Sequence, residues 1–336
     1  MRSVRVCQWA FVAFAAAAAS AADPPLRVAA PALEPLPERI EAAASAEVVE
    51  LGRRLFFDVR LSGDNTLSCA TCHDPAKGFA DGLARSRGVG GGLLSRNTPT
   101  VLNVGGLEPL MWDGRAETLE EQALLPLQSH DEMRQDVEEL VRELSADAEC
   151  ESRFRSAFGE GVSSERVAAA LAAFQRTLTT PNSPLDRHLR GDGEALSAGA
   201  RRGLELFRGD ADCIRCHHGP LLTDGQFYRL GVGFTDRGRE LTTGRREDRF
   251  KLRTPPLRNV ALTAPYMHDG SQRTLFDVVE FYYRGAPGRA PDGTLLDVQP
   301  LRDRSYSEIG DLVEFLEALT GEPPQAAAPD ADAADG

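Results

Sequence analysis

The sequence reads CATCH at residues 69–73 and CIRCH at residues 213–217. In the pattern Cys-x-x-Cys-His, two thiols can form thioether bonds with the vinyl groups of a haem while the histidine ligates the iron. A disulfide framework or a zinc site could also use the cysteine pairs, but neither explains a histidine after both of them. A thioredoxin-like redox pair would need a surrounding βαβ pattern. We therefore expect two covalently bound c-type haems, held by Cys69, Cys72 and His73 and by Cys213, Cys216 and His217.

The surroundings of the two motifs resemble each other, which indicates an internal repeat. LGRRLFFDVRLSGDNTLSCATCHDPAKGFADG (51–82) and ARRGLELFRGDADCIRCHHGPLLTDG (200–225) each read as a helix, a loop, the motif and an Asp-Gly turn. Helical periodicity covers residues 45–57, 118–127, 133–145, 164–178, 197–207, 274–283 and 306–319. Strand alternation is scarce. The predicted fold is mainly α, with two cytochrome-c-like haem domains related by an internal duplication.

The N-terminal residues predict export, and composition predicts the domain boundaries. Arg2 and Arg5 precede an apolar run and small residues that suit cleavage, so residues 1–22 read as a signal peptide and the periplasm as the destination. We expect an extended arm over 23–40, an N-terminal cytochrome c domain over 41–185, a C-terminal one over 186–321 and a disordered tail over 322–336. No later stretch approaches the roughly 20 apolar residues of a membrane span.

The net charge of the chain limits the classes of molecule that it could bind. A formal net charge of −13 argues against nucleic acid, whose phosphates require basic patches. The acidity is an ordinary solubility feature, and it would also suit a basic redox partner. Cys150 remains once the four haem thiols are assigned, and we interpret it as a small buried hydrophobic residue. A homodimer is compatible with the sequence.

Several longer stretches resemble the bacterial di-haem cytochrome c peroxidase and MauG family, from about residue 46 to residue 320. They are LGRRLFFD, CATCHDPAKGFADG, RNTPTVLN, MWDGRAETLEEQALLP, RTPPLRNVALTAPYMHDGS and TLFDVVEFYYRG. The resemblance implies that the haem of His73 reacts with peroxide, whereas the haem of His217 stores or relays electrons.

The resemblance also bears on the remaining iron ligands. Known peroxidases often carry a histidine in a Gly-His-Gly loop that caps the first iron, and Val89 stands at that place here, so the first haem is expected to be open to peroxide. The position of the second axial ligand falls on Tyr282, as in MauG-type enzymes. Tyr283 and Met267 are the alternatives. A tyrosinate would lower the reduction potential relative to methionine.

Further residues acquire roles through the resemblance. Glu132 matches a distal glutamate that would act as general acid-base, Gln122 a distal glutamine, and Trp112 a tryptophan between the haems that carries electrons. Pro126 also matches the pocket. The family binds one calcium ion, whose protein ligands match Asn97, Thr263 and Pro265.

Three functions follow as expectations. The first is a periplasmic peroxidase that reduces hydrogen peroxide with electrons from a small c-type cytochrome or copper protein. The second is a MauG-like oxidase that uses peroxide to modify a protein or organic substrate, although Ala211 replaces the surface tryptophan that MauG uses. The third is a non-catalytic di-haem electron carrier, which would need both irons six-coordinate.

Overall fold

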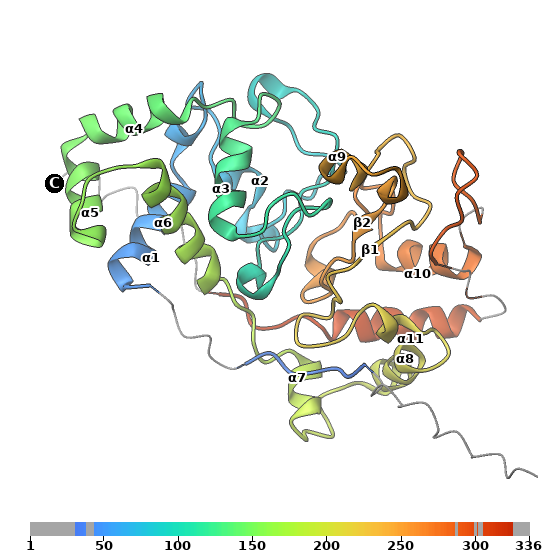
Figure 1. The fold of residues 1–336 in the computed structure, drawn as a ribbon. Coiled ribbons are helices and arrows are strands. Elements are labelled where there is room, and N and C mark those ends of the chain that lie inside the picture. The colour runs from blue at the N-terminus through green and yellow to red at the C-terminus, as the bar shows by residue number, and fades with distance from the viewer. Residues whose placement is uncertain (1–30, 38–43, 286–287, 299–300, 302–304, 325–336) are drawn as a thin grey trace, which may run out of the picture. The chain divides into compact units, whose positions relative to one another are not determined.

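The computed structural model describes residues 31–37, 44–285, 288–298, 301 and 305–324 (Figure 1). The predicted signal peptide, most of the predicted arm and most of the predicted tail lie outside these residues. The fold is mainly helical, as the periodicity predicted, with one small sheet. In the part of the chain that is described, no helix combines the length and the apolar character that crossing a membrane requires.

The helices are α1 (Ala46–Phe56), α2 (Cys69–Cys72), α3 (Leu119–Gln128), α4 (Val137–Ala146), α5 (Ala148–Phe158), α6 (Ser164–Thr177), α7 (Pro184–Leu189), α8 (Ala198–Arg208), α9 (Glu240–Thr243), α10 (Leu275–Arg284) and α11 (Tyr306–Glu317). Strand β1 (Phe227–Tyr228) pairs antiparallel with β2 (Leu252–Arg253). Side-chain oxygens fix where several helices begin. For example, the hydroxyls of Thr118 and Thr274 accept hydrogen bonds from the backbone N–H groups of Glu121 and Asp277 at the starts of α3 and α10.

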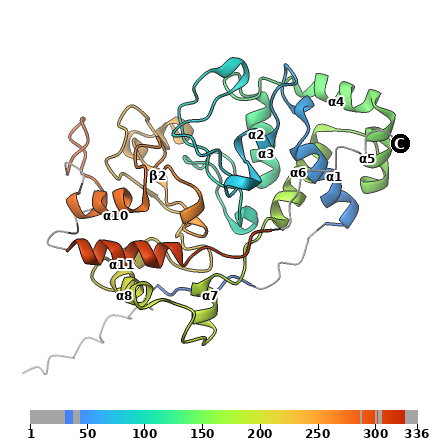
Figure 2. The ribbon, with the colours of Figure 1, turned by 180° about the vertical axis from the view of Figure 1, so that it is seen from behind.

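Two helix pairs organise two hydrophobic cores. Helix α1 packs on α6 and α8 packs on α11, and each pair lies side by side in both views (Figures 1 and 2). Glycine permits each close approach, because a Cβ at Gly52 would lie 1.9 Å from the carbonyl oxygen of Ala170, and one at Gly203 would lie 2.0 Å from that of Asp311. The N-terminal core forms around the first pair and the C-terminal core around the second.

A buried polar network links the loops that follow the two motifs. Asn103 and Asn259 both have φ near +60°, and the amides of both donate to the hydroxyl of Thr180, at 2.7 and 2.6 Å. The Asn103 side-chain oxygen accepts from the Thr180 N–H, and that of Asn259 accepts from the Gly321 N–H. Thr180 belongs to the segment that connects α6 to α7. One hydroxyl of this connection thus holds a loop from each half.

A buried ion pair anchors α7. Arg258 Nη1 lies 2.8 Å from Asp186 Oδ1, and the two side chains are 1% and 0% exposed. The same carboxylate accepts from the N–H of Leu36 in the N-terminal arm and from Ser183, which caps α7. The pair therefore ties the arm, α7 and the loop after β2 together.

We expect Asp186→Ala to lower the free energy of unfolding by about 3–5 kcal/mol, because it leaves the Arg258 guanidinium buried without its counter-charge. Chemical unfolding of the haem-loaded protein measures this loss. The control is Glu149→Ala, which removes the exposed pair between Glu149 and Arg153 and should leave the unfolding free energy near that of the wild type. Equal losses in the two variants would contradict the importance of the buried pair.

Candidate functional site

The two motif histidines are oriented in the same way. His73 follows α2, and its Nδ1 donates to the carbonyl oxygen of Phe79 at 3.2 Å. His217 follows the 3₁₀ turn Cys213–Arg215, and its Nδ1 donates to the carbonyl oxygen of Leu222 at 3.0 Å. Because Nδ1 is engaged, Nε2 is the nitrogen left to ligate a metal, which is the usual arrangement of metal-binding histidines.

The backbone and the electrostatics reinforce this orientation. Phe79 and Leu222 both have φ of 57°, so each carbonyl that holds a histidine belongs to a residue in the left-handed region. Burial lowers the pKa of His73 and of His217, which favours the neutral imidazole that a metal ligand must be. The side chains thus fit the role of proximal haem ligands.

One cavity of about 1060 Å³ reaches both motifs. Its walls include the cysteines and histidines of residues 69–73 and 213–217. The volume lies just above the roughly 300–1,000 Å³ of single-ligand pockets, so the cavity has room for large cofactors. The two motifs therefore face a shared space.

The three residues predicted to act in catalysis also line this cavity. Glu132 lies in the turn after α3, Gln122 lies on α3, and Trp112 lies in the loop before it. Burial raises the pKa of the Glu132 carboxyl, while the charges of Arg115 and Arg96 oppose this shift. The structure therefore brings the predicted acid-base group into the space that His73 faces.

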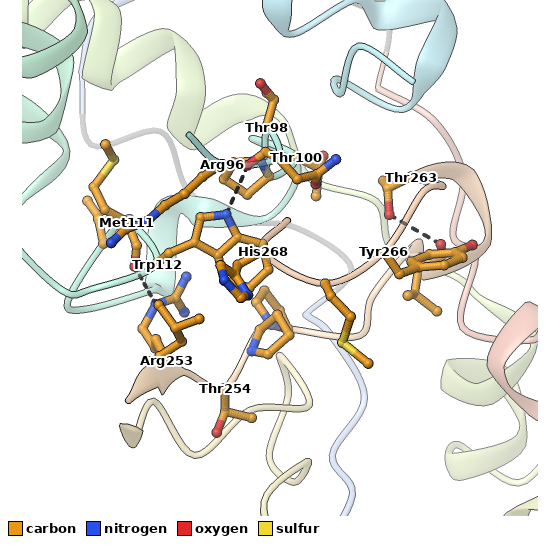
Figure 3. A pocket seen from close by; sticks show the side chains of 18 of the residues that line it. Arg96, Thr98, Thr100, Met111, Trp112, Arg253, Thr254, Thr263, Tyr266 and His268 are labelled. Carbon is orange, nitrogen blue, oxygen red and sulfur yellow. Dashed lines mark hydrogen bonds between the residues drawn. The ribbon is translucent and has the colours of Figure 1, made fainter. Parts of the chain in front are cut away.

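Trp112 lies where segments from the two halves meet (Figure 3). Its Nε1 donates to the carbonyl oxygen of Asn97 at 2.9 Å, and its ring packs edge-on against His268 with centroids 6.4 Å apart. The N–H of Asn97 donates to the carbonyl of His268, and the N–H of Arg253 donates to the carbonyl of Trp112. Backbone hydrogen bonds thus cross this junction in both directions.

The adjacent tyrosines of α10 have different surroundings. Tyr282 lines the cavity together with Cys213 and Cys216, and burial raises the pKa of its phenol. Tyr283 is 8% exposed and packs in the C-terminal core. Successive helix positions point about 100° apart, which explains the difference. Met267, the other alternative ligand, also lines the cavity.

Val89 lies in a short turn beside the predicted acid-base group. Its N–H donates to the Glu132 carbonyl oxygen at 2.8 Å, and its side chain is 8% exposed. The hydrocarbon side chain has no atom that could ligate iron. The preceding residue, Gly88, lines the cavity.

The residues predicted to bind calcium reach the same cavity. Asn97 Nδ2 donates to the carbonyl oxygen of Leu83 at 2.8 Å, which leaves Oδ1 as the oxygen available to a cation. Thr263 and Pro265 also line the cavity and can offer main-chain carbonyls. In the described part of the chain no three His, Cys, Asp or Glu residues cluster as a metal site.

Long-range contacts add residues that the sequence analysis missed. Arg96, which also lines the cavity, lies 2.7 Å from Asp113 Oδ2 and 2.6 Å from Asp236 Oδ2. Arg253 lines the cavity as well. The position of Arg96 directly before the RNTP stretch was visible in the sequence, but its pairing with Asp236, 140 residues away, has no spacing signal. Together these residues place charge around Trp112. The site thus combines two Cys-x-x-Cys-His motifs on one cavity, which is the arrangement expected of a c-type cytochrome with two haems.

Known proteins resemble the chain over most of its length. The profile of the family described as di-haem cytochrome c peroxidase matches residues 46–194. The methylamine utilization protein MauG of Methylorubrum extorquens is 41% identical over 82% of this chain and 79% of its own. The cytochrome c551 peroxidase of Pseudomonas aeruginosa is 36% identical over 87% of this chain and 85% of its own. A crystal structure of a MauG-like protein associated with microbial copper homeostasis has a TM-score of 0.76 and 33% identity, over 93% of this chain and 98% of its own.

The chain belongs to the di-haem cytochrome c peroxidase family. It is thus an oxidoreductase of the cytochrome c peroxidase type, as the sequence predicted.

Proposed function

We propose that this protein is a periplasmic peroxidase that reduces hydrogen peroxide to water with electrons from a small c-type cytochrome or copper protein. The observation that carries the proposal is the position of Glu132, whose partly buried carboxyl lines the same cavity as His73. A proton-transfer group is therefore available where peroxide would bind. The relatives named as peroxidases support the reaction.

Different residues of the chain have different roles in the proposed reaction. A haem bound at each motif supplies the redox-active iron, held by His73 in one case and by His217 in the other. Glu132 takes a proton from the near oxygen of peroxide and returns it to the departing one, which is general acid-base catalysis. Gln122, on the adjacent helix α3, can donate its amide hydrogens to bound peroxide.

Electrons must also pass between the two sites. Trp112 lies in the cavity wall at the junction of the two halves, with its indole N–H held by Asn97 and its ring against His268. This fixed orientation suits a relay. Tyr282 is the proposed second axial ligand because it faces the cavity beside Cys213 and Cys216.

A second candidate is a MauG-like oxidase of a protein or organic substrate. The observation in its favour is the combination of Val89, which cannot cap an iron, with Tyr282 in the cavity. Ala211 stands where MauG has its surface tryptophan, and its side chain is only 6% exposed. This argues for an organic substrate rather than a docked protein within the second candidate.

We further propose that the two haem units arose by duplication and that one calcium ion binds near Asn97. The paired helices α1/α6 and α8/α11, the matching carbonyls at Phe79 and Leu222, and the matching asparagines 103 and 259 support the duplication. The calcium would bind Asn97 Oδ1 and the carbonyls of Thr263 and Pro265, all of which border the cavity.

The spin states of the two irons test the proposal against a pure electron carrier. Because Val89 cannot cap the first iron, we expect the ferric protein to show one high-spin and one low-spin haem by electron paramagnetic resonance. One equivalent of hydrogen peroxide should then change the optical spectrum without added reductant. Two low-spin haems that ignore peroxide would contradict the open first site and favour the carrier.

A further inference from the structure

Arg253 is a buried cation beside the proposed electron relay. Its residue is 7% exposed, and it lines the cavity at the end of β2. The backbone N–H donates to the carbonyl of Trp112 at 2.8 Å, and Nε donates to the carbonyl of Met111 at 3.2 Å (Figure 3). The backbone of Arg253 is therefore bound to Trp112, and its guanidinium is held beside it by the carbonyl of Met111.

One end of this guanidinium is unsatisfied. Nη1 is buried and has no hydrogen-bond partner among the described residues. Two other arginines with little exposure have carboxylate partners: Arg96, whose side chain is 12% exposed, pairs with Asp113 and Asp236, and the buried Arg258 pairs with Asp186. Within the same described residues, no carboxylate forms an ion pair with Arg253, and burial alone lowers the pKa of its guanidinium to about 10. An uncompensated buried charge costs several kcal/mol, so an anion is expected in the cavity.

We propose that Arg253 binds a propionate carboxylate of one of the two haems and so ties that haem to the backbone of Trp112. The inference rests on the proposed haem occupancy of the cavity. A guanidinium can hold a carboxylate through two parallel hydrogen bonds, and Nη1 supplies a free donor for them. Each haem carries propionates, so a bound haem would supply the counter-charge that the Arg253 guanidinium lacks.

The two sides of the junction between Trp112 and His268 differ in charge. Asn97, in RNTP, donates its N–H to the carbonyl of His268, and Arg253, in RTPP, donates its N–H to the carbonyl of Trp112. The two residues thus have matching backbone roles on opposite sides of the Trp112–His268 contact. One side chain is neutral and the other is a cation. A nearby positive charge stabilises the reduced iron, so Arg253 raises the potential of the haem that it holds.

Arg253→Gln and Arg253→Lys test the inference in the full haem-loaded chain. Arg202→Gln is the matched control, since it removes one positive charge from α8, where the Arg202 side chain is 62% exposed and pairs with Asp311 of α11. Haem content per chain comes first, followed by a spectroelectrochemical titration that resolves both haems. We expect Arg253→Gln to lower one potential by at least 59 mV, a tenfold change for a one-electron couple. Arg253→Lys keeps the charge and should show a smaller shift, and the control should show none.

A second readout does not depend on the glutamine variant folding. Resonance Raman bands of the propionate groups report their hydrogen bonding, and the bands of one haem should shift in Arg253→Lys because the two-point contact is lost. Unchanged potentials and unchanged propionate bands in the Arg253 variants would overturn the inference while both haems remain bound. A wild-type chain with fewer than two haems would overturn the proposed function, and this inference with it.

Discussion

Glu132→Gln slows the reaction of the ferric protein with hydrogen peroxide by about 10²–10⁴-fold, the usual contribution of a positioned acid-base group. The substitution keeps the size of the side chain and removes its ability to take up a proton. Because the backbone carbonyl of Glu132 still accepts from Val89, the local turn should be preserved. Stopped-flow absorption of the haem bands measures the rate.

The matched control is Glu139→Gln, which makes the same chemical change on the exposed face of α4. It should react like the wild type. A normal rate in Glu132→Gln would remove Glu132 from the mechanism, whereas equal losses in both variants would indicate a nonspecific effect.

The pH dependence of this rate follows from the same carboxyl. Burial raises the pKa of Glu132 above its ordinary value of 4.5, and a base works only when deprotonated. As the pH falls through the raised pKa, the rate should therefore fall, at a higher pH than for an exposed glutamate. Arg115→Gln removes a charge that opposes the shift, so it should move this decline to still higher pH. A decline that stays at the wild-type pH in Arg115→Gln would contradict the electrostatic explanation.

Tyr282→Phe removes the low-spin signal of the second haem, whereas Tyr283→Phe retains it. Tyr282 lines the cavity beside Cys213 and Cys216, but Tyr283 packs in the C-terminal core. Burial, followed by the nearby Cys213 and Cys216, raises the pKa of the Tyr282 phenol, and a bound ferric ion would reverse this by stabilising the phenolate. Electron paramagnetic resonance of the two variants makes the comparison, and each variant is the control for the other.

The contrary result would identify Met267 as the axial ligand of the second haem. Met267 is the other alternative ligand on the cavity wall. If Tyr282→Phe kept the low-spin signal and Met267→Leu lost it, methionine would be the axial ligand. The second haem would then have a higher potential than a tyrosinate allows.

The sequence was informative where the signal is local. Hydrophobic periodicity located α1, α3, α6, α8, α10 and α11 to within a few residues. Helix α4 begins at Val137 rather than at residue 133, because Arg134 has φ of 52° and Asp136 caps the helix. Helix α5 was missed because only Cys150 and Phe154 are buried on it, too few for a clear period. The predicted domain boundary between residues 185 and 186 falls inside α7, which a Pro-containing stretch concealed.

The residues of the candidate site differ in the same respect: some could be predicted from a local signal and others could not. The motif residues were predicted from their own spacing, whereas Glu132, Gln122, Trp112 and Tyr282 were predicted only through the family resemblance. The sequence could not separate Tyr282 from Tyr283, because that depends on how α10 is rotated against its neighbours. The sequence could not mark Arg253 as a functional residue, because what distinguishes it appears only in the fold: its buried Nη1 has no hydrogen-bond partner among the described residues.

Thr180 has an evolutionary consequence. Its single hydroxyl accepts from Asn103 and from Asn259, so any mutation that removes it leaves two buried amides without a partner at once. If the halves descend from one ancestral unit, they have not been free to diverge independently at these loops. Selection on the surroundings of either motif therefore constrains the other, and Asn103 and Asn259 should vary together among natural homologues.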